Sequence, residues 1–280
     1  MSGTEVAPPG VGGRDDEPGR PGGGRRAEHR ARGSRDRRAT RGGGVVLGVV
    51  GVLGELLITA GVLLLAFLAW QLWWTDVESN REQAQLVQEQ GWDEPLAPLE
   101  AVDGPAVVTP RYDEPPVLEE PEYLTTFASM RVPRWDGEPT RTITQGTDRP
   151  NVLNPLGVGH YEGTAMPGGV GNFSLAAHRT TYGKPFNRIA ELQEGDPIVV
   201  WTEDTWYVYR VTSSQIVMPD DVQVIAPVPD QPGAEPTERF ITLTTCHPMF
   251  SARERYIVHG VLDYWAPVSE GVPAELAEVS

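Results

Sequence analysis

Cys246 is the only cysteine in this 280-residue chain. A single cysteine forms no intramolecular disulfide and excludes zinc sites that need several cysteines. It is therefore either a small buried apolar residue or a nucleophile. Cys246 ends a strand-like run, 242–246, and the following His247-Pro248 breaks the strand. A side chain at such a break can face a cleft, which favours the nucleophile.

Two further residues could act together with this cysteine. Arg255 begins the next strand-like run nine residues later, so two adjacent antiparallel strands would bring it near Cys246. His178 ends another strand-like run, 173–179. A free thiol is mostly protonated at neutral pH, and a neighbouring imidazole or guanidinium favours the thiolate. The imidazole of His178 can then protonate a leaving amine, and the guanidinium of Arg255 can stabilise an oxyanion.

The other four histidines do not predict a metal site, because their spacing matches no metal-binding pattern. His29 lies in a basic N-terminal stretch. We expect His160, in a glycine-rich segment, to be a turn or surface residue. We expect His259 to be a core residue whose ring nitrogens are hydrogen-bonded. His247 neighbours the nucleophile in sequence, but its side chain need not turn toward the cleft.

The elements that must position these residues are β-strands. From Tyr123 onward, short runs rich in β-branched and aromatic residues alternate with turn residues. The clearest runs are 198–201, 206–211, 240–245 and 256–262. Residues 202–205 predict a hairpin between the first two runs. The segment 185–192 is a short helix candidate, and the pattern as a whole predicts a mainly β fold with one closed or nearly closed barrel.

An apolar run, 45–72, precedes this β region and is interrupted only by Glu55. Its uncharged part, 56–75, would measure about 30 Å as a helix, the thickness of a bilayer core. Three tryptophans at its far end are typical of a membrane interface, namely Trp70, Trp73 and Trp74. Glu55 either lies at the inner interface or marks a partner or a proton-linked site at membrane depth.

The charge of the chain changes sign across this apolar run. The chain has 23 basic and 39 acidic residues, yet residues 1–41 hold ten arginines against six acids. The positive-inside rule therefore predicts a cytoplasmic N-terminus and an extracytoplasmic remainder. The length of the span and the lack of an A-x-A site argue against a cleaved signal peptide. The net charge of −16 argues against nucleic-acid binding.

We expect four segments in the chain. They are a disordered basic cytoplasmic tail (1–41), a transmembrane anchor (42–75), an acidic proline-rich stalk (76–122) and a catalytic domain (123–280). In the stalk, residues 78–90 could extend the membrane helix, and the proline-rich remainder predicts an extended spacer. An ordered, irregular segment wrapping the domain over 110–122 is the alternative.

The run 242–246 with Arg255 nine residues later and His178 upstream resembles the sortases, whose signature is T-L-x-T-C. Sortases are membrane-anchored cysteine transpeptidases of Gram-positive bacteria. Residues 159–172 and 177–183 resemble the segment before and around their catalytic histidine. One departure is Ala177, where the family usually has glycine, and it adds only one methyl group.

Residues 54–61 and 71–74 resemble the membrane entry of the class E sortases of actinobacteria. The resemblance implies a sortase-type barrel of about eight strands with one or two short helices. It gives His178, Cys246 and Arg255 the three catalytic roles and makes Arg253 a loop residue. It also implies no cofactor.

Class E enzymes favour an L-A-x-T-G sorting signal at the C-terminus of a secreted protein. The resemblance implies cleavage between Thr and Gly and transfer to an amine of the peptidoglycan precursor at the cell membrane. We expect the threonine-rich strand face with Thr242 and Thr244 to suit an extended peptide, and Thr244 and Thr245 to be substrate-binding residues. We expect the loop 219–238 to shape the substrate groove. A cysteine peptidase that hydrolyses its thioester and a non-catalytic anchored binding module are the alternatives.

Overall fold

A computed structural model describes residues 41–91 and 107–277. The chain divides into two compact units, Met1–Ala60 and Gly61–Ser280. Helix α1, Arg41–Glu89, crosses the boundary, so its C-terminal part belongs to the same unit as the β-strands. The predicted basic tail, except Arg41, and the predicted stalk over 92–106 lie outside the described residues.

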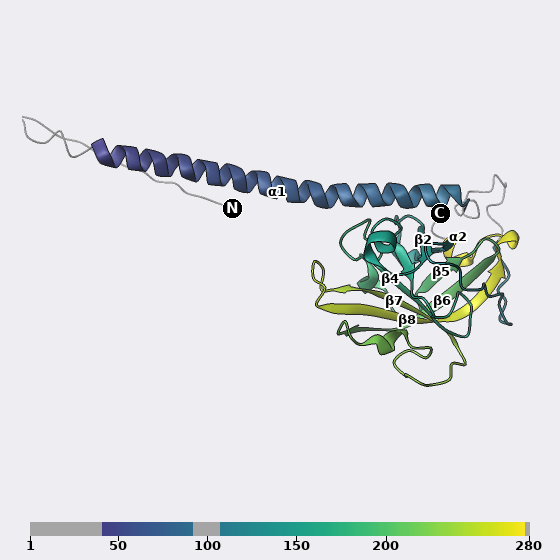
Figure 1. Cartoon of the computed structure of the whole chain (residues 1–280). Helices are drawn as coiled ribbons and strands as arrows, with labels where there is room; N and C mark the ends of the chain where they lie inside the picture. Colours follow the sequence, from purple (N-terminus) through teal and green to yellow (C-terminus); the bar gives the residue numbers. More distant parts are fainter. Residues whose placement is uncertain (1–40, 92–106, 278–280) are drawn as a thin grey trace, which may run out of the picture. The chain divides into compact units, whose positions relative to one another are not determined.

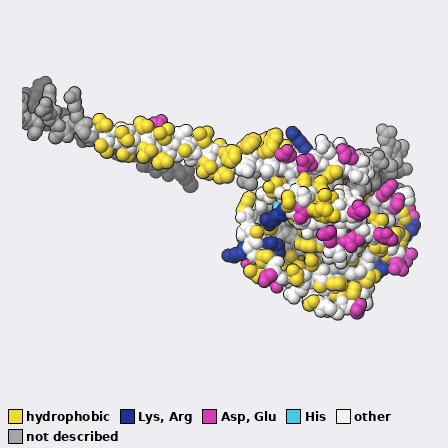
Figure 2. Space-filling model, viewed as in Figure 1, with side chains coloured by type: hydrophobic (Ala, Val, Ile, Leu, Met, Phe, Trp, Pro, Cys, Tyr) yellow, Lys and Arg dark blue, Asp and Glu magenta, His cyan; other side chains and the backbone are white. Residues whose placement is uncertain are grey.

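Helix α1 is the one helix in residues 41–91 and 107–277 that is long and apolar enough to cross a membrane. Its apolar side chains are exposed along the first part of the helix, as Figure 2 shows. Trp70, Trp73 and Trp74 lie at the end of this apolar part and are exposed as well. An apolar helix surface without protein contacts is what a lipid-facing segment requires.

Eight strands close into a barrel in the order β1-β2-β3-β4-β7-β8-β6-β5 (Figure 1). The strands are β1 Thr126–Arg131, β2 Arg141–Gln145, β3 Val158–His160, β4 Gly171–Ala177, β5 Pro197–Trp201, β6 Thr205–Val217, β7 Arg239–His247 and β8 Glu254–Pro267. Two neighbouring pairs are parallel, β2 with β3 and β4 with β7. The predicted closed, mainly β barrel is confirmed, and so is the hairpin that joins β5 to β6.

Helical structure in the described part of the β region is limited to single turns and one four-residue helix. These are η2 Pro133–Trp135, η3 Arg149–Leu153, η4 Ile189–Glu191, η5 Val222–Ile225, η6 Val268–Glu270 and α2 Ala274–Ala277. The helix candidate 185–192 is therefore reduced to the turn η4. The Phe186 amide donates to the carbonyl of His178, 3.1 Å away. The start of this segment is therefore bonded to the residue that follows β4, and its backbone is not available for a helical hydrogen bond.

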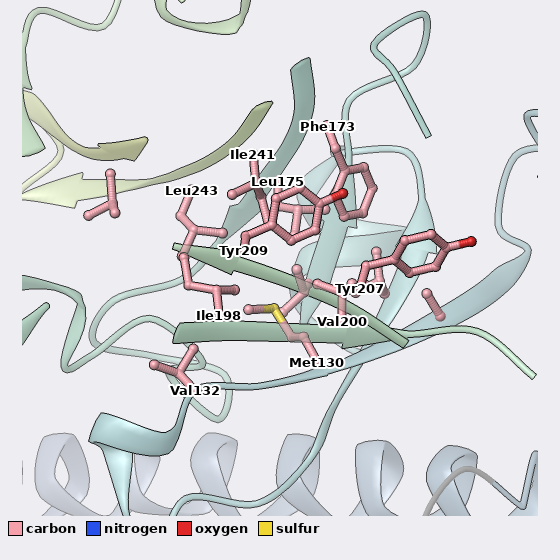
Figure 3. Close-up of a cluster of buried hydrophobic side chains, with 14 of the residues drawn as sticks. Met130, Val132, Phe173, Leu175, Ile198, Val200, Tyr207, Tyr209, Ile241 and Leu243 are labelled. Atoms are coloured by element: carbon pink, nitrogen blue, oxygen red, sulfur yellow. The ribbon is translucent and has the colours of Figure 1, made fainter. Parts of the chain in front are cut away.

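The barrel interior is filled by alternate side chains of its strands. Figure 3 shows Phe173 and Leu175 of β4 beside Ile241 and Leu243 of the neighbouring strand β7, within one apolar cluster. All four are fully buried. Because packing of this kind tolerates little displacement, the core fixes the ends of β4 and β7 relative to each other.

Residues 107–122 lie along the barrel. Val108 is 3% exposed and packs with Trp201 and Trp206. Arg111 exchanges backbone hydrogen bonds with Trp265 at 2.9 and 3.0 Å. This part of the predicted stalk follows the ordered, irregular alternative rather than the extended spacer. Its prolines limit backbone pairing, which is why the segment forms isolated bridges and no strand.

Candidate active site

Cys246 and Arg255 are directly opposite each other in the antiparallel ladder of β7 and β8. Residues opposite each other in such a ladder carry their side chains on the same face. Figure 1 shows the two strands side by side along the barrel. The prediction that adjacent antiparallel strands bring these two residues to one end of the sheet is confirmed.

His178 immediately follows β4, which runs parallel to β7 with Ala176 paired to Thr244. Extending this register by two residues places His178 beside Cys246. The Thr245 hydroxyl donates to the carbonyl of Ala177 at 2.7 Å and fastens the two strand ends together. The structure therefore brings all three predicted residues to one end of the barrel, and each is partly exposed.

The imidazole of His178 lies against an amide side chain that sequence reasoning missed. Its Nε2 is 2.8 Å from Oδ1 of Asn154, and its ring is 5.1 Å from the ring of Tyr182. Burial, together with the nearby charge of Arg149, lowers the pKa of His178 to about 4. The imidazole is therefore neutral at neutral pH. Because an amide oxygen only accepts, the proton sits on Nε2 and Nδ1 is left as the basic nitrogen.

Arg255 carries its guanidinium at the edge of the barrel. Its Nη1 donates to the backbone carbonyls of Ala252 at 2.9 Å and Glu254 at 3.0 Å. Arg253 precedes β8, is 76% exposed through its side chain, and pairs with Glu254 at 3.6 Å. The strand position belongs to Arg255, and Arg253 lies in the loop as expected.

Arg179 is a second residue that sequence reasoning missed. It is 7% exposed, and its Nη1 lies 2.8 Å from Nδ1 of His247 and 3.3 Å from the carbonyl oxygen of Cys246. The guanidinium also lies 5.4 Å from the ring centre of Tyr256. The pKa of Arg179 is lowered from its usual value by burial, and the interactions with Tyr256 and Cys246 offset only part of this effect. This buried guanidinium thus contacts both the backbone carbonyl of Cys246 and the side chain of the next residue, His247. Its place directly after the candidate histidine was the available signal.

Thr244 and Thr245 use their hydroxyl groups to join β7 to β4. The Thr244 hydroxyl donates to the carbonyl of Leu175 at 3.0 Å and lies 3.0 Å from the hydroxyl of Tyr161. Both threonines are buried. Their contact with a substrate stays a prediction.

The expectation for His160 is wrong. This residue is fully buried in β3, with Nδ1 2.7 Å from Oε1 of Gln145, and burial lowers its pKa to about 4. Its glycine neighbours suggested a turn, but here they accommodate a short strand between β2 and β4. His259 is a core residue as expected, with Nδ1 2.9 Å from the hydroxyl of Thr242.

The loop 219–238 is attached to the barrel through contacts with β4 and β8. Asn172 donates through Nδ2 to the carbonyls of Val224 at 3.1 Å and Ala226 at 3.0 Å. Asp230 lies 3.5 Å from the imidazole of His259. A role for this loop in shaping a substrate groove stays a prediction. Within the described ranges, no three His, Cys, Asp or Glu side chains are grouped so that they could hold a metal ion.

A family model described as a sortase domain matches residues 130–263. Sortase SrtE2 of Streptomyces coelicolor is 34% identical over 251 residues, which cover 84% of this chain and 89% of that protein. The chain belongs to the sortase family. Sortase SrtE1 of the same organism is 37% identical over 232 residues, or 80% of this chain. The matched region spans 60% of the length of SrtE1.

Solved sortase structures agree with this assignment. The SrtA sortase from Actinomyces oris superposes with a TM-score of 0.58 at 48% identity, covering 60% of this chain and 96% of that one. Sortase E1 from Streptomyces coelicolor, solved with a tripeptide in its active site, gives 0.50 at 42% identity and covers 54% and 96%. Sortase E from Streptomyces avermitilis gives 0.50 at 39% and covers 55% and 99%. These relatives support a class E sortase.

Proposed function

We propose that this protein is a class E cysteine transpeptidase that acts on secreted proteins at the outer face of the cell membrane. The observation that carries the proposal is the meeting of Cys246, Arg255 and His178 at one end of the barrel. Membership of the sortase family supports the same reaction class. The substrate is a C-terminal L-A-x-T-G sorting signal, and the acceptor is an amine of the peptidoglycan precursor.

The first half of the reaction cleaves the peptide bond between Thr and Gly. The sulfur of Cys246 attacks the Thr carbonyl carbon as its proton passes to Nδ1 of His178, which is neutral and basic in the free protein. When the tetrahedral intermediate collapses, the carbon–nitrogen bond breaks and the imidazolium gives the same proton to the departing Gly amine. A thioester and a free C-terminal peptide result.

The second half reverses these steps with a different amine. The acceptor amine attacks the thioester carbonyl, His178 takes up its proton, and the thiolate of Cys246 leaves and is reprotonated. A new amide bond joins the secreted protein to the cell-wall precursor. No cofactor enters either half, because proton transfer and charge stabilisation suffice.

Arg255 is proposed to stabilise the oxyanion of both tetrahedral intermediates. A guanidinium has five N–H donors, and the two backbone carbonyls bound by Arg255 are both reached by Nη1. Donors therefore remain for an oxyanion formed next to Cys246, the residue opposite in the ladder.

The proposed location rests on the first part of the chain. The arginine-rich residues 1–41 precede an apolar helix long enough to span a bilayer, which supports a cytoplasmic N-terminus and an extracytoplasmic barrel. A single-pass anchor would keep the site near the membrane, where a lipid-linked cell-wall precursor would also be found.

Replacing the nucleophile tests the function directly. Full-length Cys246→Ala in detergent micelles should lose cleavage of an L-A-x-T-G peptide by about 1,000-fold or more, with its thermal unfolding unchanged. Arg253→Ala is the control and should cleave like the wild type, because Arg253 lies exposed in the loop. Cleavage by Cys246→Ala at the wild-type rate would refute the assignment.

A further inference from the structure

The C-terminal part of α1, residues 76–89, is here named the juxtamembrane helix, and it buries a narrow stripe of side chains that is mostly polar. Ser79, Gln83 and Val87 are buried at intervals of four residues, which places them on one helix face. The residues between them are mostly exposed, Gln85 among them. Such a stripe needs a complementary partner, because buried polar groups must be hydrogen-bonded.

The partner is a buried arginine of the barrel. Arg141, at the start of β2, is 5% exposed and donates through Nη1 to Oδ1 of Asn80 at 2.8 Å and Oε1 of Gln83 at 2.9 Å. Its Nη2 donates to the carbonyl of Gly183 at 2.9 Å. A buried guanidinium is costly unless its donors are satisfied. The juxtamembrane helix supplies two of the acceptors that Arg141 needs.

Two glycines make room for the same helix face. Gly157 has a φ of +92°, and a Cβ atom there would lie 2.6 Å from the side chain of Gln83. Gly183 has a φ of +71°, and a Cβ atom there would lie 2.8 Å from Oδ1 of Asn80. The Gly183 amide also donates to Asp76 at 3.2 Å. The loops that contain these glycines therefore fit the helix closely.

These two loops are also the ones that flank the catalytic histidine. Asn154 lies three residues before Gly157, and Tyr182 lies directly before Gly183. The Ser79 hydroxyl donates to the carbonyl of Asn154 at 3.1 Å, and Oδ1 of Asn154 lies 2.8 Å from Nε2 of His178. A continuous chain of contacts thus runs from the juxtamembrane helix through Asn154 to the imidazole.

We propose that Asn154 is a positioning residue that fixes the tautomer and orientation of His178, and that the juxtamembrane helix holds Asn154 in place. The juxtamembrane helix then supports the active site instead of only linking the barrel to the apolar part of α1. A neutral imidazole that donates its Nε2 proton to Asn154 keeps Nδ1 as the base for the thiol. Triads of the Cys-His-Asn type divide these roles in the same way. The kinetic experiments described below rest on the proposed sortase function.

A spectroscopic measurement tests the first half of the proposal without any substrate. Full-length protein labelled with ¹⁵N-histidine in micelles should show His178 with Nε2 protonated and Nδ1 unprotonated at neutral pH, its signals being assigned by their loss in His178→Gln. Asn154→Ala should lose this single tautomer. A wild-type His178 protonated on Nδ1, or an unchanged tautomer in Asn154→Ala, would overturn the role of Asn154.

Turnover distinguishes positioning from mere folding. Asn154→Ala should lower kcat by about 10- to 100-fold with KM nearly unchanged. Asn154→Asp keeps the acceptor but adds a negative charge, which favours the imidazolium and should move the acid limb of kcat/KM up by about one pH unit or more. A normal kcat in Asn154→Ala or an unshifted pH profile in Asn154→Asp would contradict the proposal.

A matched pair of double variants tests the helix. Ser79→Ala/Gln83→Ala removes the buried stripe contacts and should lower kcat by about 3- to 10-fold, a smaller loss because Asn154 itself remains. The control Gln85→Ala/Gln88→Ala changes only exposed positions of the same helix and should match the wild type. Equal kcat in the two double variants would overturn the helix role.

Two further readouts keep these tests separable. If Ser79→Ala/Gln83→Ala fails to fold, Ser79→Ala alone removes the single contact with Asn154 and should still lower kcat. If the wild type neither cleaves the peptide nor forms an acyl-enzyme, the proposed function fails. The tautomer measurement still decides the role of Asn154 in that case, because it needs no turnover.

Discussion

At the scale of single residues, the site combines a neutral imidazole with a buried guanidinium. Burial holds the pKa of His178 at about 4, so the imidazole can accept the thiol proton. Arg179, the next residue in the chain, contacts the carbonyl of Cys246 and the imidazole of His247. In the proposed reaction these two adjacent residues have different roles, with proton transfer at His178 and the geometry of the nucleophile segment at Arg179.

Arg179→Met should test this division, because it keeps an apolar stem and removes the donors. We expect a loss of about 1–3 kcal/mol in the free energy of unfolding and a clear fall in kcat/KM, since the acceptors around the nucleophile lose their partner. Arg253→Met is the matched control and should change stability by less than about 0.5 kcal/mol. Urea unfolding and peptide cleavage measure both effects. Identical behaviour of the two variants would contradict the role of Arg179.

The sequence was informative for residues whose position follows from strand order. Cys246 and Arg255 stand on strands that follow each other in the chain, so antiparallel pairing of neighbouring strands was enough to predict that they meet. The place of His178 beside them rested on the resemblance, because β4 pairs with β7 over a long separation in sequence. Asn154 and Arg179 could not be predicted in their roles, because their contacts depend on how loops far apart in the chain pack. His160 was misjudged because a three-residue strand between glycines has no periodicity to detect.

At the scale of elements, the segment 107–122 packs along the outside of the barrel and is here named the strap. Val108 fills an apolar cluster with Trp201 and Trp206, and the Tyr207 hydroxyl donates to the carbonyl of Pro116 at 2.7 Å. The strands themselves were predictable from their β-branched and aromatic runs. The strap was not, because prolines and acids dominate its composition and only scattered apolar side chains mark its contacts.

Val108→Ala should destabilise the barrel by about 1–2 kcal/mol, because it removes buried methyl groups and leaves a cavity. Val107→Ala is the matched control, since Val107 is 56% exposed, and it should cost less than about 0.5 kcal/mol. Thermal unfolding of the two full-length variants compares them. Equal midpoints would show that the strap adds no stability.

At the scale of the whole molecule, buried histidines link stability to pH. Burial lowers the pKa of His160 and His178 to about 4 each, and that of His259 below its usual value. In the unfolded chain these groups titrate near 6.5, so between about pH 6.5 and pH 4 the unfolded state binds more protons than the folded state. The free energy of unfolding must therefore fall as the pH is lowered through this range.

His160 alone should account for about 2 kcal/mol of this loss at pH 5. His160→Gln removes the titrating group, so the slope of unfolding free energy against pH should become shallower, whatever the variant costs at neutral pH. Urea unfolding at several pH values gives both slopes. An unchanged slope in His160→Gln would show that His160 is not held neutral in the folded protein.

In the proposed function, an amine resolves the thioester on Cys246. The most direct measurement incubates the full-length protein with an L-A-x-T-G peptide, with and without a glycine-type amine, and identifies the products by mass spectrometry. We expect a transient mass on Cys246 that corresponds to the acyl-enzyme, and a peptide ending in Thr joined to the amine as the main product. A product that ends in free Thr at the same rate whether or not the amine is present would contradict the proposed function and indicate a cysteine peptidase.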